Sequence, residues 1–299
     1  MTGKSPAITL NNGVKMPALG LGVFQSSPEQ TATAVEYAIT SGYRLIDTAA
    51  AYFNEQQVGE AIKRSGIDRS EIFVTTKLWI TTFGFERALR AFDSSMRKLG
   101  LDYLDLYLLH WPLPIDFDAT VASYNAAEKL LADGRVRAIG VSNFNPKHLE
   151  GLIARSEVVP AVNQVELHPF FIQRDVREAD KRHGVVTQSW SPIGGINVYW
   201  AAGPNAARNP LQHPVVVELA AKYHKTPAQV VLRWHIEHGL SAIPKSVRPE
   251  RIAENIDIFD FALTAQDINA INSLDTGVRG GPDPEKFDTT TVSLKVEDE

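Results

Sequence analysis

The sequence predicts a single-domain α/β fold, a (β/α)8 TIM barrel, and three observations support this prediction. Eight short apolar runs are spread along the 299 residues, and eight parallel strands close such a barrel. Most successive runs begin 23–33 residues apart, which fits one strand plus one crossover helix. Several runs are apolar without strict alternation, as strands that are buried on both faces should be.

A hairpin precedes the first predicted strand. Residues 7–18 contain two short runs on either side of Asn12-Gly13, a pair that favours a tight turn, and we expect the hairpin to plug one end of the barrel. No linker or low-complexity stretch interrupts the chain, so we assign residues 1–299 to one domain. The predicted strands cover residues 20–24, 44–49, 72–78, 103–110, 136–143, 162–167, 185–190 and 241–246.

Capping signals mark the helices between these strands. Ser27–Gln30 combines an N-cap serine, a proline at the first helical position and a glutamine at the third, and the helix should end at Gly42. Asn145-Pro146 opens a second helix, and Thr226-Pro227 opens another that should end near Gly239.

Two segments lack this regular pattern. Residues 194–212 are too long for a simple connection, and the tail 276–299 is irregular. Because long loops on a barrel usually carry function, we expect 194–212 to be an active-site loop, although a surface excursion is the alternative.

Composition excludes several classes of protein. The chain has no cysteine, which excludes disulfides, cysteine-ligated metal sites and a cysteine nucleophile. A net charge of −5 argues against a nucleic-acid or anionic-membrane partner. No apolar run approaches the roughly 18 residues of a membrane span, and the N-terminus lacks a signal-peptide core. The histidines show no metal-ligand spacing, so we expect no metal and a soluble, cytoplasmic protein.

The candidate catalytic residues lie at the ends of predicted strands, where barrel active sites form. Asp47, Lys77 and His110 lie at or near the ends of three runs, and Tyr52 follows Asp47 closely. A tyrosine can act as an acid when a neighbouring cation favours its phenolate, and a carboxylate can hold that cation in place. Taken singly, each residue could instead cap a loop, pack in the core or reach solvent.

The motifs around these residues resemble the aldo-keto reductase family. RLIDTAAAYFNEQQVGEAI contains Asp47 and Tyr52, TTKL contains Lys77, and LDYLDLYLLHWP contains His110. GVSNF, NQVELHP, SWSPIG and IPKSVRPERIAEN follow in the family's order, so the resemblance extends from the hairpin to about residue 255. The short connection after LLHWP is similar to that of the bacterial 2,5-diketo-gluconate-reductase-like branch.

The resemblance implies NADPH-dependent reduction of aldehydes or ketones to alcohols by a monomer that binds a small carbonyl compound. Tyr52 would be the general acid, Lys77 paired with Asp47 would lower the pKa of the phenol, and His110 would orient the carbonyl. Ser142, Asn143 and Gln164 would bind the nicotinamide carboxamide, Trp190 would stack on the nicotinamide ring, and Lys245, Ser246 and Arg251 would bind the 2′-phosphate. The further expected cofactor residues are Gly22, Ser191, Pro192, Gly194, Val247, Glu254 and Asn255, and the expected substrate pocket comprises Phe24, Phe53, Trp79 and Trp111.

Other functions stay open at this point. A barrel glycosidase could use Asp47 and Glu166 as its paired carboxylates, and an aldolase could form a Schiff base on Lys77. A non-catalytic NADPH-binding sensor is also compatible with the fold. A Rossmann nucleotide site is disfavoured, because Gln25 occupies the third glycine position of the motif.

Overall fold

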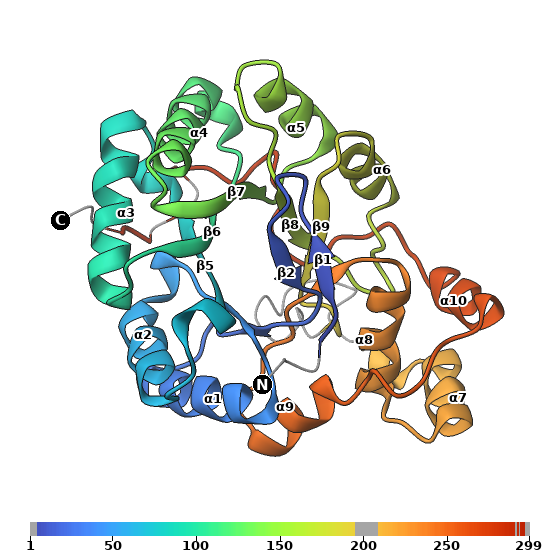
Figure 1. The fold of residues 1–299 in the computed structure, drawn as a ribbon. Coiled ribbons are helices and arrows are strands. Elements are labelled where there is room, and N and C mark those ends of the chain that lie inside the picture. The colour runs from blue at the N-terminus through green and yellow to red at the C-terminus, as the bar shows by residue number, and fades with distance from the viewer. Residues whose placement is uncertain (1–4, 195–208, 291, 293, 297–299) are drawn as a thin grey trace.

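The computed structural model, which describes residues 5–194, 209–290, 292 and 294–296, confirms the predicted barrel (Figure 1). Its eight strands form one parallel sheet in which each strand pairs with the next along the chain. Each strand lies within one of the predicted runs. The strands are β3 (Leu21–Gly22), β4 (Leu45–Asp47), β5 (Phe73–Leu78), β6 (Leu104–Leu109), β7 (Val136–Ser142), β8 (Val162–Glu166), β9 (Val186–Trp190) and β10 (Ser241–Ala242).

Backbone contacts between the first and last strands close the sheet into a barrel. The amide of Gly20 donates to the carbonyl of Ala242 at 2.9 Å, and the amide of Gly22 donates to that of Pro244 at 3.1 Å. A Cβ atom on Gly22 would lie only 2.9 Å from the carbonyl oxygen of Ile243. Glycine at this position therefore permits the close approach of β3 to the chain that follows β10.

Helices surround the barrel, and the predicted capping signals are present at their ends (Figure 1). Ser27 and Gln30 form a capping box at the start of α1, which ends at Gly42 with φ 104°. Between β9 and β10 the chain forms α7 as well as α8, which explains the length of that connection. The helices are α1 (Pro28–Ser41), α2 (Glu55–Arg64), α3 (Phe85–Leu99), α4 (Phe117–Ala132), α5 (Pro146–Ile153), α6 (Arg174–Arg182), α7 (Pro214–Tyr223), α8 (Pro227–Glu237), α9 (Pro249–Ile256) and α10 (Ala265–Asn272). Short 3₁₀ helices are η1 (Ala50–Tyr52), η2 (Arg69–Glu71), η3 (Ile80–Thr82), η4 (Pro114–Asp116) and η6 (Pro210–Gln212).

The N-terminal hairpin covers one end of the barrel. Strands β1 (Ala7–Thr9) and β2 (Lys15–Pro17) pair antiparallel, and Gly13 takes the positive φ of 87° that the turn requires. Met16 is fully buried and packs in one cluster with strand residues such as Leu45 and Leu106. The hairpin therefore plugs the amino-terminal end of the strands, as the sequence predicts.

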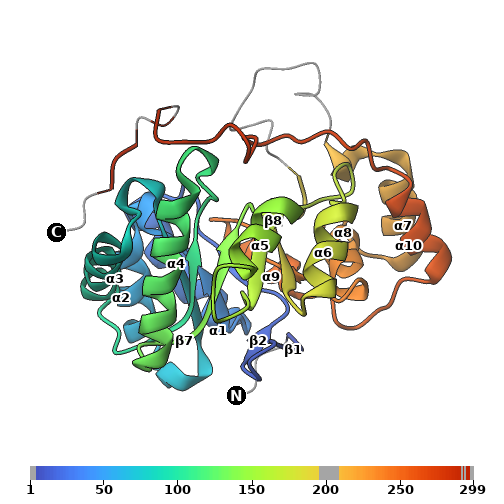
Figure 2. The same ribbon diagram turned by 90° about the horizontal axis from the view of Figure 1, so that it is seen from above.

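The C-terminal segment crosses the opposite end of the barrel. Figure 2 shows the chain after α10 running over the strands on the side away from the hairpin. None of its described residues forms a helix or strand. The expected active-site loop 194–212 falls largely outside the described residues, which resume at Asn209 and form η6.

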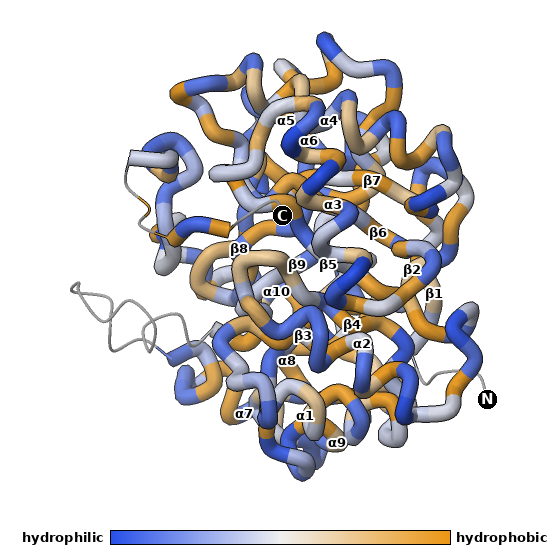
Figure 3. The backbone as a smooth tube through the Cα atoms, turned by 90° about the vertical axis from the view of Figure 1, so that its left-hand side faces the viewer, coloured by the Kyte–Doolittle hydropathy of each residue, from blue (hydrophilic) through white to orange (hydrophobic). Residues whose placement is uncertain are grey.

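Hydropathy follows this layered arrangement. Hydrophobic stretches lie along the inner strands, whereas the surrounding helices carry hydrophilic and hydrophobic residues in alternation (Figure 3). Within the described residues, no helix combines the length and apolarity of a membrane span.

Candidate active site

The four predicted catalytic residues meet at the carboxyl ends of β4, β5 and β6. Lys77 is fully buried, and its ammonium lies 2.6 Å from Oδ1 of Asp47. The same ammonium donates to the backbone carbonyl of Thr48 at 2.9 Å and to the hydroxyl of Tyr52 at 3.3 Å. The ring of His110 lies 5.6 Å from the ring of Tyr52, measured between centroids. Residues from separate strand ends therefore form one compact group.

Burial and charge decide the protonation states of this group. Burial acts to lower the pKa of Lys77, but attraction to Asp47 and the hydrogen bonds outweigh it, so its pKa lies above the usual value. Burial and the positive charge of Lys77 hold the pKa of His110 well below its usual value. At neutral pH the site therefore contains a charged lysine and a neutral imidazole.

The pKa of Tyr52 departs from the sequence-based expectation. Burial raises this pKa, and the nearby ammonium of Lys77 offsets only part of the rise. The expected effect of Lys77 is therefore present, but the net pKa of the phenol lies above its usual value, and not below it. A phenol in this state keeps its proton throughout the neutral range and is available as an acid.

A chain of buried amides holds the second oxygen of Asp47. Nε2 of Gln164 donates to Oδ2 of Asp47 and to Oε1 of Gln188, both at 2.7 Å. Both oxygens of Asp47 therefore accept a hydrogen bond, Oδ1 from the ammonium of Lys77 and Oδ2 from the amide of Gln164. Gln188 was not among the predicted site residues, although a polar residue within the buried run VTQSW was a usable signal.

Trp190 is fixed at the end of β9 by a side-chain hydrogen bond. Its indole nitrogen donates to Oδ1 of Asn143 at 2.9 Å, and Nδ2 of Asn143 donates to the carbonyl of His110 at 3.0 Å. Asn143 adopts a positive φ of 64°, which asparagine tolerates better than most residues. The orientation of the indole is therefore coupled to the backbone of His110.

These side chains open into a cavity of about 360 Å³ at the carboxyl end of the barrel. Aromatic rings form much of its wall, and Phe287 stacks on Trp111 with 3.9 Å between ring centroids. The residues that the C-terminal segment contributes to the wall were not predicted, because this segment carries no motif. The lining residues are Gly22, Phe24, Asp47, Ala51, Tyr52, Trp79, His110, Trp111, Ser142, Asn143, Gln164, Trp190, Ser191, Pro192, Ile193, Gly194, Ile243, Lys245, Arg251, Pro282, Phe287 and Leu294.

Two cations, Lys245 and Arg251, line the same cavity. Neither forms an ion pair with another residue in the described part of the chain, and burial lowers the pKa of Lys245. Four of the expected nucleotide-binding residues do not line the cavity and lie instead on the adjoining loop and helix α9; two of them are Ser246 and Glu254. The Ser246 hydroxyl accepts from the amide of Arg248 at 3.1 Å, and Glu254 accepts from Thr226 at 2.7 Å. The other two are Val247 and Asn255.

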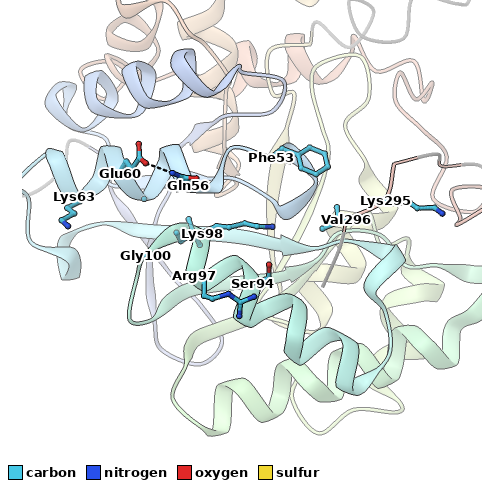
Figure 4. A pocket seen from close by; sticks show the side chains of 12 residues that line it. Phe53, Gln56, Glu60, Lys63, Ser94, Arg97, Lys98, Gly100, Lys295 and Val296 are labelled. Carbon is cyan, nitrogen blue, oxygen red and sulfur yellow. Dashed lines mark hydrogen bonds between the residues drawn. The ribbon is translucent and has the colours of Figure 1, made fainter. Parts of the chain in front are cut away.

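Phe53 does not belong to this cavity, which corrects the sequence-based expectation. It follows η1 with a positive φ of 56°, and its side chain is 58% exposed. It lines a separate surface hollow of about 930 Å³ between α2, α3 and Lys295–Val296 (Figure 4). The left-handed turn after Tyr52 directs the two neighbouring aromatic side chains to different places.

Asp47 and Glu166 are not free to act as the paired carboxylates of a glycosidase. Glu166 is fully buried, accepts from the amides of Gly280 and Gly281, and does not line the cavity. Asp47 is occupied by Lys77. Among the described residues, no group of three acidic or histidine side chains could hold a metal ion.

Comparison with known proteins agrees with this geometry. The model of the aldo/keto reductase family matches residues 18–276. Morphine 6-dehydrogenase from Pseudomonas putida is 58% identical over 294 residues, covering 98% of this chain and 99% of that protein. Methylglyoxal reductase DkgA from Escherichia coli is 46% identical over 282 residues, covering 94% of this chain and 97% of that protein. The crystal structure of a Bombyx mori aldo-keto reductase in complex with NADP matches with a TM-score of 0.86 at 36% identity, covering 93% of this chain and 95% of that one.

Proposed function

This chain belongs to the aldo/keto reductase family, and we propose that it reduces aldehyde or ketone carbonyls to alcohols with NADPH. The observation that carries the proposal is the contact of the Tyr52 hydroxyl with the buried Lys77–Asp47 pair on the wall of an aromatic cavity. The named relatives, a dehydrogenase and a reductase, belong to the same broad class of reaction.

The residues at the cavity suit NADPH. Lys245 and Arg251, which lack a described counterion, would hold the 2′-phosphate through charge-assisted hydrogen bonds. The fixed indole of Trp190 offers a flat face for the nicotinamide ring. The amide nitrogen of Gln164 is already committed, which leaves its carbonyl oxygen to accept from the carboxamide. When bound, NADPH supplies the hydride that reaches the carbonyl carbon.

Tyr52 supplies the proton in this proposal. Its hydroxyl gives a proton to the carbonyl oxygen, so that the C=O double bond becomes a C–OH group. The ammonium of Lys77 stabilises the phenolate that remains, and Asp47 holds this ammonium in place. Neutral His110, beside the tyrosine ring, can donate a hydrogen bond that orients the carbonyl oxygen.

The wall of the cavity favours apolar or flat carbonyl compounds. Phe24, Trp79, Trp111 and Phe287 present aromatic surface, and burial of apolar ligand surface against such rings is favourable. The cavity volume of about 360 Å³ lies at the small end of ligand sites.

A kinetic screen of the purified protein tests the proposal. Aromatic aldehydes, aliphatic aldehydes and ketones are each mixed with NADPH or NADH, and cofactor absorbance is followed with time. We expect many turnovers of NADPH per protein molecule with at least one apolar carbonyl compound. NADPH binding without turnover on every substrate would indicate a cofactor sensor, and turnover of substrates without any cofactor would contradict the proposed reaction.

A further inference from the structure

A buried carboxylate anchors the C-terminal segment over the barrel. Glu166 is the last residue of β8 and is fully buried. Its Oε1 accepts from the amide of Gly280 at 2.7 Å, and its Oε2 accepts from the amide of Gly281 at 2.9 Å. Residues more than a hundred positions apart in the sequence are therefore joined by two hydrogen bonds to one side chain.

The buried charge makes these hydrogen bonds obligatory. A carboxylate that is removed from water must be compensated, and each amide that donates to it lowers the cost of burial. His168 Nε2 also lies 3.1 Å from Oε1, and the Arg279 guanidinium lies 4.0 Å from Oε2. Moving the glycine pair away would leave Glu166 without two of its hydrogen-bond partners in a dry site.

Trp190 also lies close to this backbone. A Cβ atom on Gly281 would lie 2.6 Å from Cη2 of Trp190 and 3.0 Å from Oε2 of Glu166. Glu166 and Trp190 are register partners on adjacent strands. The carboxylate and the edge of the indole therefore leave no room for a side chain at Gly281, and the indole lines the cavity.

The position of the glycine pair determines where the next residues lie. Pro282 follows directly and lines the cavity, and Phe287 lines it while stacking on Trp111. Further along, the segment is held by Glu285, which accepts from Asn145 at 2.9 Å. Glu166 is the anchor adjacent to Pro282, where the segment enters the cavity wall.

We propose that Glu166 is a positioning residue that selects substrates by size. By holding Gly280 and Gly281 beside Trp190, it fixes the wall formed by Pro282 and Phe287, against which the apolar group of a bulky carbonyl compound would pack. It does not line the cavity and takes no part in proton transfer. The inference rests on the proposed reduction of carbonyl compounds.

Glu166→Gln provides the sharpest test, because it preserves the volume of the side chain. The side-chain amide nitrogen of the glutamine is a donor and would face a backbone N–H group, where a carboxylate oxygen of Glu166 now accepts. We expect the KM of a bulky aromatic aldehyde to rise about tenfold, the scale of one weakened charge-assisted hydrogen bond. We expect the KM of a small aliphatic aldehyde to change by less than about threefold, and kcat for both to stay near that of the wild type.

A second variant changes the contact between Gly281 and Trp190 and does not alter the charge of the protein. Gly281→Ala introduces the methyl group that collides with Trp190, and we expect the same preferential loss with the bulky aldehyde. Glu128→Gln is the matched control, because Glu128 accepts from the amides of Glu157 and Val158, both at 2.8 Å, on α4 and away from the cavity. This control should retain the size preference of the wild type.

Hydrogen exchange of the Gly280 and Gly281 amides gives a readout that does not depend on turnover. In Glu166→Gln we expect this exchange to be about tenfold faster or more, because the amides lose their charged acceptor. Faster exchange together with the selective rise in KM would support the inference. Equal KM changes for both aldehydes, or unchanged size preference despite faster exchange, would overturn it. A wild-type protein that reduces no carbonyl compound would instead overturn the proposed function.

Discussion

Replacing Lys77 with methionine should abolish most activity through the acidity of Tyr52. The ammonium of Lys77 lies 3.3 Å from the phenol oxygen. At an effective dielectric constant of about 20, a charge pair at this distance interacts by about 5 kcal/mol. That corresponds to about a thousandfold or more in the balance between phenolate and phenol. Since the charge develops only partly as the proton leaves, we expect kcat to fall by about 10²–10⁴-fold.

The same substitution should also reduce stability, and a double variant separates the two effects. Lys77→Met leaves Asp47 buried with Gln164 as its remaining side-chain partner, and breaking a buried pair costs about 3–5 kcal/mol. Asp47→Asn/Lys77→Met removes both charges and should recover much of this stability while remaining inactive. The assay measures kcat with NADPH and the urea unfolding midpoint for all three proteins. A kcat of Lys77→Met equal to that of the wild type would refute the reasoning. Recovery of activity together with stability in the double variant would also refute it.

Three further substitutions test other parts of the account. Arg251→Ala should weaken NADPH binding by about 1.5–3 kcal/mol, measured by tryptophan fluorescence, and leave NADH binding unchanged; equal losses would contradict a phosphate contact. Burial raises the pKa of Asp180 to about 7, so this group is protonated when folded and ionised when unfolded between about pH 4 and 7. Wild-type stability should therefore fall as pH rises through this range, by about 4 kcal/mol relative to Asp180→Asn; parallel pH profiles would contradict this. Gln188→Leu leaves an N–H group of Gln164 unpaired and should cost about 1–3 kcal/mol of unfolding free energy, and an unchanged unfolding midpoint would contradict the amide chain.

The barrel and the proximity of Asp47, Tyr52, Lys77 and His110 could be predicted because their signals are local. The sequence around Ser27–Gln30 specifies a helix start through contacts within four residues, and the structure forms that capping box. Asp47 and Lys77 each lie near the end of an apolar run, and parallel strands bring all such ends to one rim. The repeated strand–helix unit therefore predicts that residues distant in the sequence lie together, even when their individual contacts are not known.

The parts that escaped prediction depend on contacts between distant segments. Nothing near Glu166 or Gly281 in the sequence indicates that they meet, because no periodic pattern links a strand end to an irregular tail. The position of Phe287 in the cavity wall could not be predicted for the same reason. The prediction for Phe53 failed for a different reason. Phe53 has a positive φ at the end of η1 and lines the separate hollow, whereas its neighbour Tyr52 lines the cavity. The net pKa of Tyr52 also required the extent of burial, which sequence alone does not supply.

The most direct measurement is the rate of carbonyl reduction by Tyr52→Phe. This variant removes only the hydroxyl that contacts Lys77 and retains the ring that packs beside His110. With the best substrate of the wild type, we expect kcat to fall by about 10²–10⁴-fold, while NADPH still quenches tryptophan fluorescence with an unchanged Kd. A variant that binds NADPH normally and retains half of the wild-type kcat would contradict the assignment of Tyr52 as the proton donor.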